Sequence, residues 1–219
     1  FAFRPKRESG CVPDGLISFI GFFSDFGDEN ILWPVMALTG LLLIVQARRK
    51  IFFQWLALVI VVFGGMLVLK LEFEACGRLP GQNLYSPSGH TAGTTFVYGS
   101  MIVLFGRLPI AGFVGALAIA LLAGAARVWL HVHSVAEVCV GGALGMVGVL
   151  LLTFARYREI QTSSKQKKPD WSVVVLLVGV LIVALSLHGL RSPAEVWLEY
   201  FSHRFVAPFR HCPVTLSTT

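Results

Sequence analysis

The feature that most constrains the fold is a succession of apolar runs separated by short polar connectors. A membrane helix needs about 20 mainly apolar residues, because the hydrocarbon core is about 30 Å thick. The candidate runs are 31–47, 51–71, 88–105, 108–130, 135–155 and 171–190. Only 14% of the residues are charged, whereas a soluble domain has about 25%. We therefore expect an all-α, polytopic membrane bundle of about six transmembrane helices.

Two less apolar segments flank these runs. Residues 1–30 end in the aromatic stretch "LISFIGFFSDFGDEN", which is too short to cross a bilayer at about 1.5 Å per residue. Residues 191–219 are amphiphilic and suit an interfacial helix or a loop. The expected organisation is an N-terminal interfacial segment (1–30), a transmembrane core (31–190) and a C-terminal amphiphilic tail (191–219).

The basic residues of the connectors predict the orientation. The connectors at 48–50, 107 and 156–170 carry nine basic and two acidic residues, whereas the opposite side carries nine basic and ten acidic ones. Three of the basic residues on the opposite side, Lys70, Arg78 and Arg127, lie near membrane edges, and setting them aside leaves nine basic residues against six. Cytoplasmic loops are enriched in Lys and Arg. We therefore expect an integral protein of a bacterial inner membrane, with the 72–87 loop, the "HVHS" break and both termini facing the periplasm. The net charge of +6 comes without an aromatic-interleaved basic patch, so nucleic-acid binding is not expected.

The four cysteines give no metal-binding spacing. Cys139 falls inside an apolar run and is interpreted as a small apolar filler. Cys11, Cys76 and Cys212 fall on the predicted outer side, where disulfides can form. Three cysteines allow one bridge at most, and the sequence does not choose it.

Ionisable residues near the membrane gather at the run ends on the predicted outer side. Such residues are rare in membrane helices and usually mark a site. If the helices alternate in direction, one face of the membrane contains Lys70, Arg78, His90, Arg127, His131, His133 and Glu137. This shared face is the main indication of a single functional site.

The segment "YSPSGHTAG" at 85–93 begins one of the runs. Free backbone N–H groups at a helix N-terminus bind anions such as phosphate. Gly89 permits close approach, Ser88 offers a hydroxyl and an N–H, and His90 can exchange a proton near neutral pH. The simpler interpretation of this segment is a helix N-cap. The positive charge that a phosphate needs would come from Lys70, Arg78 and Arg127.

The two charged positions upstream of this segment also have simpler interpretations. Lys70 could snorkel to the headgroups from a helix end, and Arg78 could be a solvated loop charge. Neither alternative is excluded by the sequence.

His133 and Glu137 are four residues apart, so they face each other if a helix continues through them. A carboxylate bound to one imidazole nitrogen fixes the tautomer and leaves the other nitrogen as a nucleophile. Glu137 also suits the start of a helix, where the dipole favours an acid. His131 is interpreted as an interfacial polar residue. A metal site at His131, His133 and Glu137 is disfavoured because the nearby basic residues would repel a cation, and no cofactor is expected.

In order and spacing these motifs resemble those of the type-2 phosphatidic acid phosphatase superfamily, over about residues 65–145. Its signature is Lys-x6-Arg-Pro, then Pro-Ser-Gly-His, then Ser-Arg-x5-His-x3-Asp. The segment 87–90 matches the second part completely, and Arg127, His133 and Glu137 match the third in spacing. The chain departs from the signature at three points: seven residues separate Lys70 from Arg78 with Leu79 before Pro80, Ala126 replaces Ser, and Glu137 replaces Asp.

The resemblance implies a metal-independent hydrolase acting on lipid phosphates. His133 would attack phosphorus to form a phosphohistidine, Glu137 would orient His133, and His90 would protonate the leaving oxygen. The residues that would bind the phosphate are Lys70, Arg78, Ser88, Gly89 and Arg127. The implied substrates are polyprenyl diphosphate, phosphatidate, phosphatidylglycerol phosphate or lipid A phosphates of the cell envelope.

Two other functions remain open for this chain. In a phosphotransferase, a lipid hydroxyl rather than water would accept the phosphate from His133. A non-catalytic lipid-binding or transport module could use the same scaffold. The sequence carries no signal for a protein partner.

Overall fold

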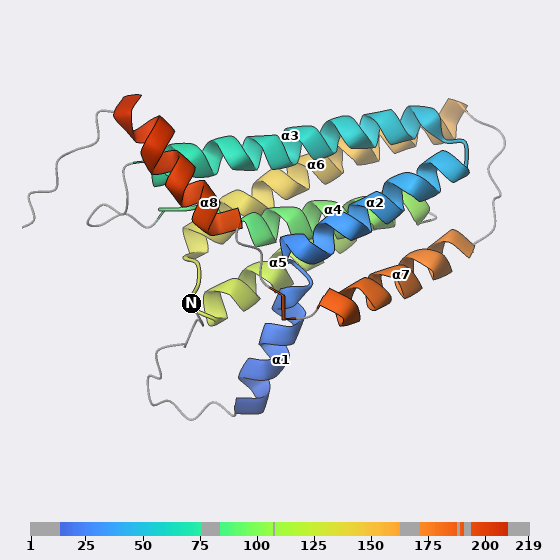
Figure 1. The fold of residues 1–219 in the computed structure, drawn as a ribbon. Helices are drawn as coiled ribbons and strands as arrows, with labels where there is room; N and C mark the ends of the chain where they lie inside the picture. The colour runs from blue at the N-terminus through green and yellow to red at the C-terminus, as the bar shows by residue number, and fades with distance from the viewer. Residues whose placement is uncertain are drawn as a thin grey trace, which may run out of the picture.

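The computed structural model describes residues 14–75, 84–106, 108–162, 171–187, 189–190 and 194–209. Across these ranges every regular element is helical, and the principal helices are α1 (Asp14–Asp25), α2 (Glu29–Val45), α3 (Arg49–Glu74), α4 (Gly89–Phe105), α5 (Pro109–Trp129), α6 (Val135–Thr162), α7 (Trp171–Leu187) and α8 (Ala194–Phe201). Successive helices from α2 to α7 alternate in direction (Figure 1). The predicted all-α class is confirmed.

Three helices are long and apolar enough to cross a membrane, namely α3, α5 and α6. A fourth span results if α1 and α2, which meet at a 47° bend, are counted as one. The apolar helix α7 and the central helix α4 each have 17 residues. The prediction of about six spans is therefore confirmed only in part: the described part of the chain has three or four helices, or bent pairs, that could cross a membrane.

Several predicted boundaries shift. Glu72–Glu74, expected in a polar loop, form the last turn of α3, and Glu74 is buried there. Glu29 and Asn30 belong to α2 rather than to the N-terminal segment. The helix expected to end at Ala155 continues to Thr162. Cys139 lies within the apolar helix α6, as expected, and its side chain is exposed there, whereas Cys11, Cys76 and Cys212 lie outside the described residues.

Helix α4 is the centre of the bundle, because it packs against α2, α3, α5 and α6. Its buried residues run from Thr91 to Leu104 and cover most of its circumference. Small residues allow this close approach: a Cβ at Gly145 of α6 would lie 2.6 Å from the Ala92 carbonyl oxygen. Gly141 and Gly145, four residues apart on α6, therefore let this helix pack closely against α4 and the segment before it. Because α4 is enclosed, its N-terminus is surrounded by the ends of its neighbours.

The turn after α5 determines where α6 begins. His131 has φ 54°, its N–H donates to the Val128 carbonyl, and the Val132 N–H donates to the Arg127 carbonyl. This pair of bonds is a Schellman motif, which ends a helix within two residues. The tight reversal places His133 directly before the first turn of α6.

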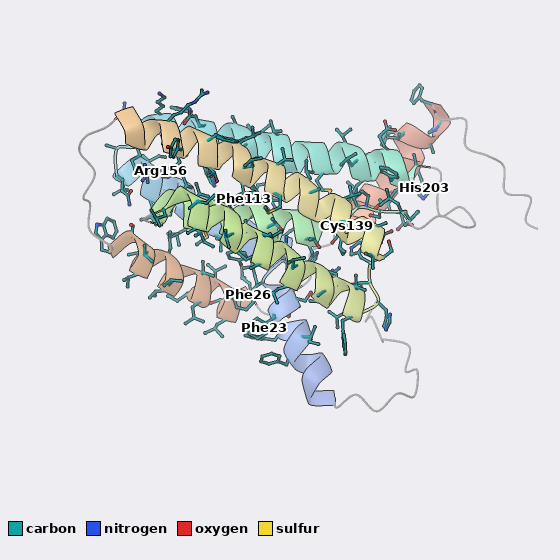
Figure 2. All side chains as sticks on the ribbon, turned by 180° about the vertical axis from the view of Figure 1, so that it is seen from behind. Phe23, Phe26, Phe113, Cys139, Arg156 and His203 are labelled. Atoms are coloured by element: carbon teal, nitrogen blue, oxygen red, sulfur yellow. The ribbon has the colours of Figure 1, made fainter. Side chains whose placement is uncertain are left out.

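Helix α8 crosses the end of α3, on the side of the bundle where α4 and α6 begin (Figure 1). Ser202, in the π-helical turn that continues α8, is fully buried, and its Oγ donates to the Leu71 carbonyl at 2.9 Å. Figure 2 shows His203 and Cys139 at this end and Arg156 at the opposite end. An exposed aromatic row covers α8 and its continuation: Trp197, Tyr200, Phe201 and Phe205. The tail prediction, left open between helix and loop, is therefore resolved as helix over 194–209.

Candidate active site

Ser88 begins α4 as its N-cap. Its backbone is extended (φ −70°, ψ 102°), and its Oγ accepts a hydrogen bond from the Thr91 N–H at 3.3 Å. Its own N–H donates to the Glu137 carbonyl oxygen at 3.1 Å, which joins the start of α4 to α6. The "SPSGH" segment is thus a helix cap, as its simpler interpretation predicts, and it is also fixed against the neighbouring helix.

Two glycines allow this arrangement. A Cβ at Gly141 would lie 2.3 Å from the Ser88 carbonyl oxygen, so α6 can pass this point only with glycine there. A Cβ at Gly89 would lie 3.5 Å from Cε and 3.8 Å from Nζ of Lys70. Lys70 is only 7% exposed, so its ammonium group lies beside the first turn of α4. A cation beside the N–H groups of a helix N-terminus gives a strongly anion-attracting position.

Glu137 connects the motifs through both carboxylate oxygens. Oε1 accepts from the backbone N–H groups of Tyr85 (2.9 Å) and Ser86 (3.1 Å). Oε2 accepts from the Ser134 N–H at 2.9 Å and lies 3.1 Å from Nδ1 of His133. The Glu137 side chain is almost fully buried. One buried carboxylate therefore holds both the segment before α4 and the histidine before α6.

Ser134 and Glu137 also form the reciprocal cap of α6. The Glu137 N–H donates to Ser134 Oγ at 3.3 Å, while the Ser134 N–H donates to the Glu137 side chain. This is a capping box, in which the N-cap hydroxyl and the acid three residues later satisfy each other's backbone donors. The predicted His133–Glu137 contact is confirmed, and the simpler role of Glu137 at the helix start holds together with it.

His90 lies in the first turn of α4 and meets the turn between α1 and α2. Its Nε2 is 3.6 Å from Oδ1 of Asp28, and both side chains are mostly buried. Arg127, in the last turn of α5, donates through Nη1 to Ser24 Oγ of α1 at 3.4 Å. Both predicted site residues therefore contact the N-terminal segment, which the sequence had placed only at the membrane interface.

A second buried carboxylate supports the segment before α4. Ser86 donates its hydroxyl hydrogen to Oε1 of Glu74, which lies in the last turn of α3. Glu74 stands four residues after Lys70, so both project from the same face of α3. Sequence reasoning missed Glu74 because it ended the helix before it; the spacing from Lys70 would have indicated it if α3 had been extended by one turn.

The eight predicted site residues are all described except Arg78, which lies outside the described residues. Direct contacts join Ser88 to Glu137 and Glu137 to His133, and Lys70 adjoins Gly89. His90 instead contacts Asp28 and Arg127 contacts Ser24, two partners that the sequence did not indicate. Within the described ranges no three His, Cys, Asp or Glu side chains are grouped so as to hold a metal ion.

Comparison of the chain with family models, with curated proteins and with solved structures gives no match.

Proposed function

We propose that this protein is an integral-membrane lipid phosphatase that works through a phosphohistidine. The observation that carries the proposal is the position of Glu137: the same carboxylate binds Nδ1 of His133 and the two N–H groups just before the α4 cap. A nucleophile with its orienting acid is thereby fixed to a helix N-terminus suited to phosphate. The sequence resemblance to the type-2 phosphatidic acid phosphatases points to the same chemistry.

The reaction assigns each side chain one task. With Nδ1 held by Glu137, Nε2 of His133 attacks phosphorus while the P–O bond to the lipid breaks. His90 gives its proton to the leaving oxygen. Lys70 and Arg127 offset the charge that gathers on the phosphoryl oxygens, and the Ser88 hydroxyl and the Gly89 N–H bind them. Arg78 is assigned to the same task from the sequence alone. Water then releases phosphate from His133.

The surroundings favour a lipid over a soluble ester. Helix α8 lies across the end of α3 and exposes aromatic rings, with Trp197 59% exposed and Tyr200 56% exposed. Tryptophan and tyrosine are enriched where a bilayer meets water. A phosphate held at this end of the bundle is then at the depth of lipid headgroups. We further propose that α2–α7 all cross a bacterial inner membrane with this end on the periplasmic side.

The test is phosphate release from purified lipid phosphates by the wild-type chain and by His133→Ala. We expect the substitution to reduce turnover at least ~100-fold with folding preserved, because the nucleophile is lost. His131→Asn is the matched control: His131 is exposed in the same turn, asparagine tolerates its positive φ, and turnover should be unchanged. Unchanged phosphate release by His133→Ala would refute the assignment.

The same assay on purified lipid phosphates also distinguishes the alternative functions by their products. A phosphotransferase would yield a newly phosphorylated lipid in place of free phosphate. A non-catalytic lipid-binding or transport module would keep its function in His133→Ala. Activity that survives EDTA and is blocked by vanadate, a phosphate mimic, would exclude a metal-dependent reaction.

A further inference from the structure

The turn between α1 and α2 fits closely against the polar start of α4. Tyr98 Oη donates to the Phe26 carbonyl oxygen at 2.9 Å. A Cβ at Gly27 would lie 2.5 Å from Thr94 Oγ1 and 3.1 Å from Cδ2 of His90. The contact therefore requires glycine at position 27 and holds the turn beside the His90 ring.

Asp28 ends this turn and begins α2. It is the N-cap residue of α2, yet its side chain makes no capping hydrogen bond to that helix. The carboxylate is instead directed at His90, with Oδ1 3.6 Å from Nε2 and side-chain exposures of 16% and 17%. A carboxylate this close, largely shielded from water, favours the protonated form of an imidazole.

We propose that Asp28 is a positioning residue that keeps His90 oriented and protonated for its role as acid. The proposal rests on the function proposed above. With Nε2–H directed at Asp28, the proton on Nδ1 is the one available to the leaving oxygen. As the P–O bond breaks, its electron pair goes to that oxygen, which takes the proton from His90. The neutral His90 ring later regains a proton from water.

Other charged groups lie on the helices packed against α4, at the same end of the bundle as His90. They are Glu29 on α2, Lys70 and Glu74 on α3, Arg127 on α5, and His133 and Glu137 on α6. Glu74 and Glu137 bind Ser86 and His133, whereas Lys70 and Arg127 disfavour a further positive charge. Asp28 therefore offsets the two cations at the ring itself.

The direction of the pH effect follows from this balance. His90 acts as an acid only when it is protonated, so kcat/KM falls as pH rises through its titration. Without Asp28 the ring loses its proton more easily, and this fall begins at lower pH. For one contact at this distance and burial, we expect loss of the Asp28 carboxylate to shift the alkaline limb of the kcat/KM–pH profile to lower pH by about 1 unit.

The experiment compares wild type, Asp28→Asn and Asp28→Glu on an alkyl lipid phosphate, with kcat/KM measured across pH. Asp28→Asn should shift the alkaline limb, and Asp28→Glu should largely restore it. Glu29→Gln removes a carboxylate from the adjacent position and is the matched control, with no expected shift of similar size. On p-nitrophenyl phosphate, whose leaving phenolate needs no proton, Asp28→Asn should lose much less activity.

The results distinguish a failure of the role of Asp28 from a failure of the proposed function. Suppose that the wild type is active and His133→Ala is not. The role of Asp28 alone is then overturned if Asp28→Asn does not shift the alkaline limb of the kcat/KM–pH profile, or if it loses equal activity on the lipid phosphate and on p-nitrophenyl phosphate. If the wild type and His133→Ala behave alike, the proposed function fails and the role of Asp28 falls with it. Should Asp28→Asn not fold, Gly27→Ala moves the carboxylate away from His90 and must shift the limb in the same direction.

Discussion

Replacing Glu137 with Gln tests the connection between the two motifs most directly. Each oxygen of Glu137 faces backbone donors: Oε1 faces the N–H groups of Tyr85 and Ser86, and Oε2 faces that of Ser134 and Nδ1 of His133. A glutamine has only one accepting oxygen. Its NH2 group must therefore oppose at least one backbone N–H, whichever way the amide is turned.

The less costly orientation directs the NH2 group toward His133 and Ser134. One backbone N–H is then unsatisfied, at about 1–3 kcal/mol, and the two bonds to Tyr85 and Ser86 lose their charge assistance. We expect Glu137→Gln to lower the free energy of unfolding by about 3 kcal/mol. The NH2 group also forces Nδ1 of His133 to accept, which puts the ring proton on Nε2, the nitrogen that should attack. By analogy with a serine-protease triad that has lost its acid, turnover should fall by about 10³–10⁴-fold.

Equilibrium unfolding in mixed micelles and phosphate release together measure these two losses. Exposed Glu199 on α8 provides the control variant Glu199→Gln, which should change neither quantity. Glu137→Asp restores the charge but is shorter by one methylene, so it cannot reach both sets of donors and should still lose about 1–2 kcal/mol. A Glu137→Gln protein with wild-type stability would refute the reasoning about the buried carboxylate, and one with wild-type turnover would refute its role in orienting His133.

Two glycines give further predictions. Gly141→Ala places a Cβ 2.3 Å from the Ser88 carbonyl oxygen and should cost about 1–3 kcal/mol in unfolding free energy through overpacking. The neighbouring Gly142→Ala meets its nearest side chain at 3.5 Å and should leave stability unchanged or higher, so equal losses in both would contradict the packing argument. Gly89→Ala makes only ordinary contacts with Lys70 but fills the space beside the helix N-terminus. We expect unchanged stability and a KM for lipid phosphate about tenfold higher; an unchanged KM would argue against phosphate binding there.

The parts of the site that the sequence predicted are those set by local spacing. His133 and Glu137 are four residues apart beside a predicted helix start, and the structure places them in contact at 3.1 Å. The Ser-Pro-Ser-Gly segment before an apolar run predicted a helix N-terminus, and Ser88 is its cap. Alternating helix direction then predicted that these two starts share one end of the bundle, as Figure 1 shows.

Contacts between distant segments were not predictable in the same way. Asp28 and Ser24 reach His90 and Arg127 because α1 and α2 meet at a 47° bend, and this turn lies against the start of α4. Periodicity describes how one helix is buried, and it contains no information about such a bend. Helix α4 is not among the long apolar helices for a related reason. It has 17 residues, and because other helices enclose it, its N-terminal half can carry Thr91, Thr94 and Thr95 in place of apolar residues. Their hydroxyls are satisfied within the helix or by Ser88.

The glutamate at position 137, which departs from the aspartate of the resembled signature, follows from the local geometry of α6. Ser134 caps this helix, and a capping box uses Glu or Gln at the third helical position because that side chain reaches back to the cap N–H. The same length lets Oε1 extend to Tyr85 and Ser86 while Oε2 stays with Ser134 and His133. An aspartate could serve one of these partners but not all of them. Glutamate in place of the signature's aspartate therefore gives the carboxylate an additional structural role and keeps the contact that orients His133.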